Sequence, residues 1–428
     1  MSLRSVHTDC LHLDGYKPCP PHKRYGAVCE GCSDYRPLSF RVLILKVGAA
    51  GEVIRNTPVL HRLRELYPDA EITWVTDYPD FIPRSFVHKV LKYDWKSVNL
   101  IQEQEYDLLL SLDKETHVCA VANRMRAKVK KGFLLDAKGK IVPADKDARR
   151  KWLTGIFDDL MKMNTKHYVE EIFEICGWQW AGEKYILEGA KSPEASFRKD
   201  GSKPLIGLNT GAGSIWPTRI WPEDKWRELI GALRSGGHDV LLLGGPDEHG
   251  KNLRLAEATG ARYEGVKGFL EFSGLVGLCD VVVTSVTMAL HIAIALERRI
   301  VLLNNIFNGV EFHLYGLGSI VHPDLDCLAC YKRAFDAGCP PDTCIDLITV
   351  EAVLREIEAN VHILRRPGGD DGAAAENPRA LSVPAFIDQG GRGQDLLQDR
   401  GDPASPGALH YPALVRLQRL RRERLPSP

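Results

Sequence analysis

A glycine-bearing loop followed by an acid is the first feature of the sequence that could support chemistry. Gly48 and Gly51 interrupt an apolar run at residues 40–47, and Glu52 follows at the expected start of a helix. Open α/β sheets bind ligands at the carboxyl ends of their strands, so this carboxylate is placed to accept the proton of an incoming hydroxyl. The alternative is that Glu52 only complements the helix dipole. The loop lacks the GxxxxGK[ST] pattern, which excludes an ATPase-type phosphate loop.

A second loop has the composition of a diphosphate site. The small residues Thr210, Gly211 and Gly213 follow an apolar run, and their backbone amides can approach a pyrophosphate. Thr218 and Arg219 come shortly after. A guanidinium there can neutralise a leaving diphosphate by a bidentate contact. A solvated arginine is the alternative.

Two further loops carry polar side chains at expected strand ends. Glu248 follows LLLGGPD, where an acid commonly accepts hydrogen bonds from ribose hydroxyls. Ser285 and Thr287 stand at an expected helix N-terminus, which favours anions. His291 lies four residues later on the same helix, and the alternative for it is a buried core histidine.

Eight of the eleven cysteines fall into two clusters. The first comprises Cys10, Cys19, Cys29 and Cys32, and the second comprises Cys327, Cys330, Cys339 and Cys344. In a reducing compartment clustered cysteines bind metal more often than they form disulfides, and four thiolates suit a tetrahedral site. The first cluster is looser, with His12 and His22 as competing ligands, and zinc is the first choice there. Both sites would be structural, cysteine spacing does not distinguish zinc from iron, and free or redox-active thiols are the alternative.

The elements that would position these side chains alternate along the chain. Strands are expected at residues 40–47, 71–77, 106–113, 205–211, 239–245, 281–286 and 298–305. Helices are expected at residues 53–66, within 146–176, and at 222–235, 287–296 and 350–360. This alternation predicts doubly wound parallel sheets, and a polar segment at 188–203 divides the pattern in two. The fold class is therefore α/β with two Rossmann-like halves, and a single long sheet is the alternative.

Composition limits the function classes. Lys plus Arg equals Asp plus Glu, 56 against 56, so no overall charge favours nucleic acid or an anionic membrane. The first ten residues contain no apolar signal region, and no run is long enough to span a bilayer. We expect a cytoplasmic protein with at most peripheral membrane contact and no nucleic-acid partner.

Taken in order, these segments resemble the ADP-heptose:lipopolysaccharide heptosyltransferase family, glycosyltransferase family 9. The segments are GAAGEVIRNTPVLHRLRELYPDAEITWVTD, GLNTGAGSIWPTRIWPEDKW, LLLGGPDE and VTSVTMALHIAIAL, within residues 41–358. The resemblance implies a GT-B fold, in which two Rossmann-like domains face each other across a cleft. It also implies an ADP-activated heptose as donor, no cofactor or metal for transfer, and inversion at the anomeric carbon.

The resemblance also assigns roles to residues. Glu52 matches the catalytic base, which is usually an aspartate in the family, and Arg219 matches a lysine that contacts the phosphates. Glu248 matches the ribose contact, while Thr287 and His291 match a loop in which the family has Asp-Thr-Gly-Pro-x-His. This chain has Val286, Met288 and Ala289 at the Asp, Gly and Pro positions of that loop. The second cysteine cluster is similar to a cysteine finger of autotransporter heptosyltransferases, where the metal is iron.

The expected organisation has four parts. Residues 1–39 form a Cys-rich knuckle, 40–190 the acceptor domain, 204–366 the nucleotide-sugar domain with the finger at 327–344, and 367–428 a disordered tail. The expected function is inverting transfer of a sugar from a nucleotide-diphosphate donor to a lipopolysaccharide-core, other glycan or protein acceptor. The alternatives are a non-catalytic nucleotide- or metal-binding protein on a transferase scaffold, and a GT-B-fold epimerase acting on the donor alone.

Overall fold

The computed structural model describes residues 4–191, 203–213, 216–332, 339 and 344–365. By its internal contacts the chain divides into residues 1–374 and 375–428. The expected disordered tail at 367–428 lies outside the described residues, and so does most of the expected linker at 188–203. Within the described ranges no helix is both long and apolar enough to cross a membrane.

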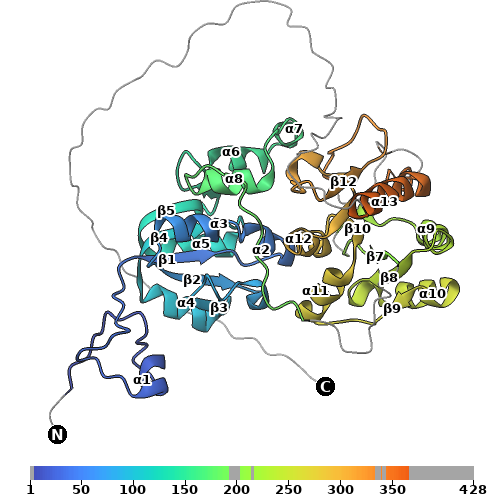
Figure 1. Cartoon of the computed structure of the whole chain (residues 1–428). Helices are drawn as coiled ribbons and strands as arrows, with labels where there is room; N and C mark the ends of the chain where they lie inside the picture. The colour runs from blue at the N-terminus through green and yellow to red at the C-terminus, as the bar shows by residue number, and fades with distance from the viewer. Residues whose placement is uncertain (1–3, 192–202, 214–215, 333–338, 340–343, 366–428) are drawn as a thin grey trace, which may run out of the picture. The chain divides into compact units, whose positions relative to one another are not determined.

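The first half of the chain builds one six-stranded sheet (Figure 1). Its strands are β1 (Arg41–Leu45), β2 (Glu71–Thr76), β3 (Lys89–Lys92), β4 (Glu105–Ser111), β5 (Arg126–Leu135) and β6 (Ile141–Pro143). They are ordered β3-β2-β1-β4-β5-β6, and β6 is antiparallel to β5 while the other pairs are parallel. The order reverses at β1, so that the topological switch point lies between β1 and β4.

The second half builds a separate six-stranded sheet that is parallel throughout. Its strands are β7 (Leu205–Asn209), β8 (Asp239–Leu243), β9 (Arg262–Tyr263), β10 (Val281–Ser285), β11 (Arg299–Leu303) and β12 (Gly318–Val321). The order β12-β11-β10-β7-β8-β9 is that of a Rossmann sheet, with its switch point between β7 and β10. Two separate sheets confirm the expected pair of Rossmann-like halves and exclude the single long sheet.

Helices cover both faces of each sheet. In the first half these are α2 (Ala50–Asn56), α3 (Val59–Leu66), α4 (Trp95–Gln102), α5 (Thr116–Arg124), α6 (Arg149–Thr154), α7 (Asp158–Lys162) and α8 (Tyr168–Ile175). In the second half they are α9 (Glu223–Ser235), α10 (His249–Thr259), α11 (Phe269–Leu278), α12 (Met288–Ala295) and α13 (Val350–Leu364).

Alternation along β1 shows why both faces need cover. Val42 and Ile44 pack with α2, α3 and α8, whereas Leu43 and Leu45 point to the other face and pack with α4 and α5. Successive side chains of a strand point to opposite faces, so a continuous apolar run is buried on both sides. The same hydrophobic cluster that contains Val42 also contains residues of α11 and α12, which means that the two halves share one core.

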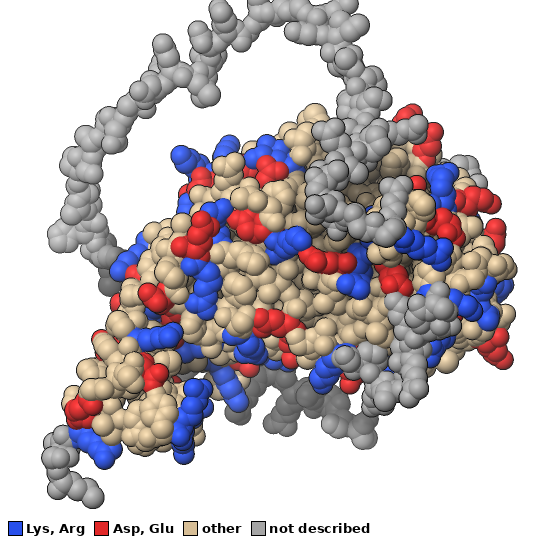
Figure 2. Space-filling view, viewed as in Figure 1, with Lys and Arg blue, Asp and Glu red and all other residues tan. Residues whose placement is uncertain are grey.

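Strands with polar or very short sequences were not anticipated. β5 carries Arg126, Lys128, Lys130 and Lys131, which hide its period, and β9 has only two residues. The expected strand at 205–211 ends at Asn209, which leaves Thr210 and Gly211 in the loop where a ligand contact requires them. On the face shown in Figure 2, acidic and basic side chains are interspersed, in keeping with the balanced charge.

The N-terminal segment, residues 4–38, consists of loops around the short helix α1 (Pro20–Tyr25). An isolated antiparallel bridge joins Cys10 to Pro37. Pro21 is the one residue of this segment that is buried.

Candidate functional site

Glu52 lies in the first turn of α2, directly beyond the carboxyl end of β1. Its Oε1 accepts a hydrogen bond from Nη2 of Arg55, and its Oε2 accepts one of 2.7 Å from the hydroxyl of Tyr168. The Lys46 ammonium is 3.8 Å from Oε2. The guanidinium of Arg55 also lies 3.3 Å from the centre of the Tyr168 ring, so the three partners form one group around the carboxylate.

These partners keep Glu52 ionised. Burial opposes the charge, but Arg55, Lys46 and the Tyr168 hydroxyl outweigh it and lower the pKa of Glu52 to about 2. About 32% of the side-chain surface remains exposed. The carboxylate is therefore ionised at neutral pH and partly accessible, and its role as proton acceptor stays a prediction.

A second acid, at the carboxyl end of β4, forms hydrogen bonds with the loop that follows β1. Asp113 follows β4, and its Oδ1 accepts a 2.7 Å hydrogen bond from the Lys46 ammonium. Its Oδ2 accepts one of 2.5 Å from the Val47 amide. Sequence reasoning did not select Lys46, Asp113, Arg55 or Tyr168. Their positions directly after β1 and β4 could have indicated the first two, because parallel strands end at the same edge.

The switch point of the second sheet carries a cluster of neutral polar groups. The Asn209 amide, at the end of β7, donates to the hydroxyls of Thr284 (3.0 Å) and Thr287 (3.2 Å) and to the Gly211 carbonyl (3.3 Å). Thr287 caps α12, since its hydroxyl accepts a 3.2 Å hydrogen bond from the Ala289 amide. The expected position of Thr287 at a helix N-terminus is therefore observed, and Asn209 and Thr284 were missed.

Arg219 is buried between the loops that follow β7 and β10. Its Nη2 donates to the Ala212 carbonyl (2.6 Å) and its Nη1 to the Val286 carbonyl. Burial lowers the pKa of Arg219 to about 10, which leaves it charged at neutral pH. Among the described residues no carboxylate pairs with it. A buried charge without an opposite charge is costly, so this geometry favours an anionic ligand.

Lys251 is a second cation at the same loop and was not selected from the sequence. Its ammonium donates a 2.7 Å hydrogen bond to the Thr210 carbonyl, and burial lowers its pKa. The Thr210 hydroxyl donates to the Asn252 side-chain oxygen at 2.6 Å. Two cations thus hold the Thr210 and Ala212 carbonyls of this loop, while the Thr210 amide donates a 3.3 Å hydrogen bond to the Leu243 carbonyl.

Glu248 folds back onto this loop. Its Oε2 accepts a 2.9 Å hydrogen bond from the Gly245 amide. A β-carbon added to Gly211 would lie 2.1 Å from the Glu248 carboxyl, so a larger residue there would displace that carboxyl. Gly213 has a φ of +74°, a left-handed conformation that also favours glycine.

The remaining side chains that the sequence predicted for the site contact other protein groups. Ser285 donates a 3.1 Å hydrogen bond to the Arg219 carbonyl. His291 is buried against Gly51 of α2, and burial, with the nearby Arg55, lowers its pKa to about 3. The hydroxyl of Thr218 donates to the Lys332 carbonyl at 3.0 Å. Thr218 therefore contacts the cysteine-bearing segment.

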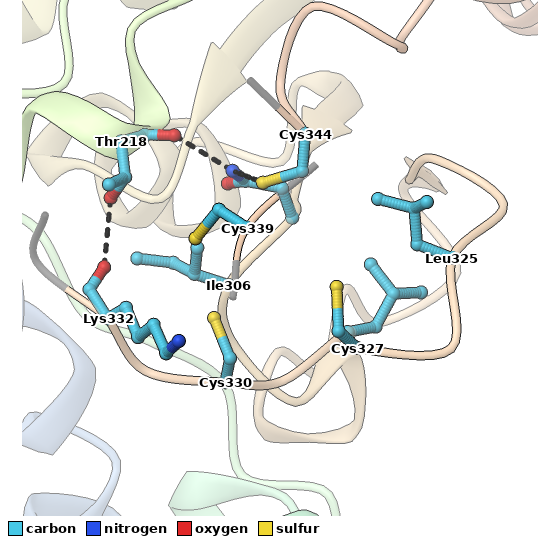
Figure 3. Close-up of a pocket in the computed structure, with 10 residues that line it drawn as sticks. Thr218, Ile306, Leu325, Cys327, Cys330, Lys332, Cys339 and Cys344 are labelled. Carbon is cyan, nitrogen blue, oxygen red and sulfur yellow. Dashed lines mark hydrogen bonds between the residues drawn. The ribbon is translucent and has the colours of Figure 1, made fainter. Parts of the chain in front are cut away.

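The second cysteine cluster surrounds one pocket, shown in Figure 3. Cys327, Cys330, Cys339 and Cys344 line it, together with Thr218. The Asn305 amide donates to the Cys344 sulfur (2.9 Å) and to the Thr218 carbonyl (2.8 Å). The expected finger is thus joined to the segment that carries Arg219.

The first cysteine cluster also lines a single pocket, with His7 and His12. In neither pocket do three or more His, Cys, Asp or Glu side chains of the described residues stand close enough together to bind a metal as they are placed. Metal binding at either cluster stays a prediction. The three isolated cysteines, Cys119, Cys176 and Cys279, are buried thiols, as expected of their apolar surroundings.

The chain is similar in sequence to proteins of one known family. The model of glycosyltransferase family 9 (heptosyltransferase) matches residues 95–313, just over half of the chain. Lipopolysaccharide heptosyltransferase 1 of Escherichia coli K12 is 25% identical over 292 residues, which cover 60% of this chain and 85% of that protein. Lipopolysaccharide heptosyltransferase 2 of Salmonella typhimurium is 29% identical over 126 residues, 28% of this chain and 36% of that protein.

Solved structures show the same fold. A glycosyl transferase family 9 structure from Veillonella parvula aligns with a TM-score of 0.57 at 15% identity and covers 76% of this chain and 98% of that one. The structure of E. coli ADP-heptose LPS heptosyltransferase II aligns with a TM-score of 0.53 at 17% identity, over 76% and 100% of the two chains.

Proposed function

The chain belongs to glycosyltransferase family 9 (heptosyltransferase) and is a glycosyltransferase, and we propose that it transfers a heptose from an ADP-activated donor to an acceptor hydroxyl with inversion. The observation that carries the proposal is the ionised Glu52 at the edge of the first sheet. Arg219 at the edge of the second sheet, which pairs with no carboxylate in the part of the chain that the structure describes, supports the donor half of the proposal.

We assign the general-base role to Glu52. The acceptor oxygen attacks the anomeric carbon of the donor and forms the new glycosidic bond. Its proton passes to the Glu52 carboxylate, while the bond from the anomeric carbon to the diphosphate oxygen breaks and ADP leaves with that electron pair. Attack opposite the leaving group inverts the anomeric centre. Arg55, Lys46 and Tyr168 hold the carboxylate in place.

We assign the diphosphate to the loop after β7. Negative charge builds on the leaving group as the bond breaks, and fixed cations stabilise it most strongly in a buried site. Arg219 and Lys251 supply charge there, and the amides of Gly211 and Gly213 and the N-terminus of α12 at Thr287 supply hydrogen-bond donors. Glu248 would accept hydrogen bonds from the ribose, and His291 and Ser285 would support the sugar–phosphate loop.

The residues described above define the acceptor less closely than they define the donor. The proposal includes a lipopolysaccharide-core sugar, another glycan or a protein side chain, bound on the first half of the chain beside Glu52. The relatives named above are lipopolysaccharide heptosyltransferases, which makes a core sugar the first acceptor to test.

We propose that the finger at Cys327, Cys330, Cys339 and Cys344 holds a structural metal ion. The four thiols line one pocket, and thiolates are the ligands that zinc and iron prefer in tetrahedral sites. The ion would not take part in the transfer. It would fix the segment whose Lys332 carbonyl accepts the hydrogen bond from the Thr218 hydroxyl. In this way it would support the position of the neighbouring Arg219.

The test compares the parent chain with Glu52→Gln, which keeps the shape of the side chain and removes its charge. We expect the variant to lose about 10²–10⁴-fold in transfer rate, measured as ADP release and glycoside mass with ADP-heptose and a panel of acceptors. Glu65→Gln is the matched control, because Glu65 is an exposed acid of α3. Full activity of Glu52→Gln would refute its role. Donor turnover without acceptor, or donor binding without turnover in the parent chain, would refute the transferase proposal.

A further inference from the structure

The N-terminal cysteines come from separate stretches of loop and meet at one place. Cys10, Cys19, Cys29 and Cys32 all line a single pocket within residues 4–38. This segment lies outside the residues 95–313 that match the family model.

Each of these cysteines belongs to a tight backbone turn. The Cys29 carbonyl accepts a 3.3 Å hydrogen bond from the Cys32 amide, so one turn carries both thiols. The Cys10 carbonyl accepts from the Leu13 amide (3.0 Å), and the Cys19 carbonyl accepts from the Lys23 amide at the start of α1 (3.0 Å). The turns hold the four sulfur-bearing positions on a fixed frame.

The segment has almost no apolar core to order this frame. Pro21 is its one buried residue, and the bridge between Cys10 and Pro37 is its one piece of sheet pairing. Short segments that cannot build an apolar core need a cross-link or a metal. The four cysteines of this segment are free thiols in the structure, and a metal ion is the cross-link that such a group of thiols can bind.

We propose that Cys10, Cys19, Cys29 and Cys32 bind a structural zinc ion that holds residues 4–38 together. Four thiolates satisfy a tetrahedral zinc ion and leave no position open for catalysis. Binding releases the thiol protons and requires the sulfur atoms to turn inward onto the ion, because they do not stand within one coordination sphere as placed. His7 and His12 line the same pocket as competing ligands, and the proposal assigns them no bond to zinc.

The experiment uses the full chain, purified under reducing conditions, with zinc and iron measured per chain. The double variant Cys29→Ser/Cys32→Ser should lose about one equivalent of zinc relative to the parent. Cys327→Ser/Cys330→Ser, in the finger, should keep that equivalent, and so should His7→Ala/His12→Ala. Tyr16→Ala is the control for an exposed residue of the same segment.

Trypsin provides a readout that does not depend on enzyme activity. Lys23 and Arg24 are potential cleavage sites within the segment, whereas Lys17 and Arg36 are each followed by a proline, and trypsin does not cut such bonds. We expect Cys29→Ser/Cys32→Ser, or the parent treated with a zinc chelator, to be cut there about tenfold faster or more, because metal binding and local folding are coupled. Circular dichroism checks that the two Rossmann-like halves remain folded.

Several results would overturn the proposal. Unchanged zinc content in Cys29→Ser/Cys32→Ser would do so, as would iron in place of zinc at this cluster. Loss of four reactive thiols in the metal-free, denatured parent chain would show disulfides instead. Loss of the zinc in His7→Ala/His12→Ala would show that histidine binds the ion and would refute the ligand set of four thiolates.

Discussion

His291 of α12 lies directly against Gly51 of α2, so that a β-carbon on Gly51 would stand 2.5 Å from the imidazole Cδ2. Gly51 immediately precedes Glu52, and α12 begins at the capping residue Thr287. This contact therefore joins the helix that carries the proposed base to the helix that carries the proposed phosphate contact. A change of side chain at Gly51 or His291 therefore affects the distance between α2 and α12.

Gly51→Ala should destabilise the protein and reduce its activity. The added methyl group must displace the buried His291 ring or move α2 from α12, and overpacking of this kind costs about 1–3 kcal/mol of unfolding free energy. Urea unfolding and steady-state kinetics measure the two effects. Gly231→Ala is the control, since a β-carbon there meets open space on α9. The second change His291→Ala should restore part of the lost stability, and failure to do so would show that the clash is not the cause.

The stability should depend on Glu52 in a defined pH range. The pKa of Glu52 is about 2 in the folded chain against an ordinary value of 4.5, so its ionised form stabilises the fold. This contribution is complete above pH 4.5 and is lost as the pH falls toward 2. Glu52→Gln should remove that part of the pH dependence when urea midpoints are compared between pH 2.5 and 7, and Glu65→Gln should retain it. An identical slope in the parent and Glu52→Gln would contradict the low pKa.

The hydroxyl of Tyr168 should matter more for the orientation of Glu52 than for folding. Tyr168→Phe removes the 2.7 Å hydrogen bond but keeps the ring beneath Arg55, so we expect a loss of about 1 kcal/mol in stability. The transfer rate should fall at saturating donor and acceptor, with donor affinity unchanged. Tyr16→Phe, at an exposed position, is the matched control. A change confined to donor affinity would place Tyr168 in another role.

Arg219→Gln should weaken the binding of the diphosphate in particular. A hydrogen bond to a charged group contributes about 1.5–3 kcal/mol, which corresponds to a loss of about 10–150-fold in ADP affinity. Calorimetry with ADP and with adenosine separates the phosphate contribution, because adenosine affinity should not change. Arg227→Gln, on the exposed face of α9, should bind ADP as the parent does. Equal losses for ADP and adenosine would indicate a collapsed site.

The sequence contains enough information for the fold because its strong signals are local. The apolar runs that became β1, β2, β4, β7, β8, β10 and β11 are short, bounded by glycine or polar residues, and separated by helical patterns. The edge strands β3, β6, β9 and β12 and the lysine-rich β5 were not predicted. A strand at an edge, or one with charged residues, is stabilised by pairing with its neighbour, and that pairing is not encoded in its own period.

The candidate site divides in the same way. The loops after β1, β7, β8 and β10, with Glu52, Arg219, Glu248 and Thr287, were identified from residue type and position at strand ends, and their roles stay predictions. The sequence did not show that Arg219 would be enclosed by two carbonyls, nor that Thr218 would contact the finger.

The sequence by itself determined the two sheets, the acid that follows the first strand and the grouping of the cysteines. Only the tertiary structure decided which groups surround that acid, because Tyr168 is more than a hundred residues away along the chain and Lys46 is fixed by Asp113, which follows another strand. Local patterns depend on neighbouring residues, whereas charges and hydrogen bonds at a site depend on chain segments that meet only after the sheets have formed.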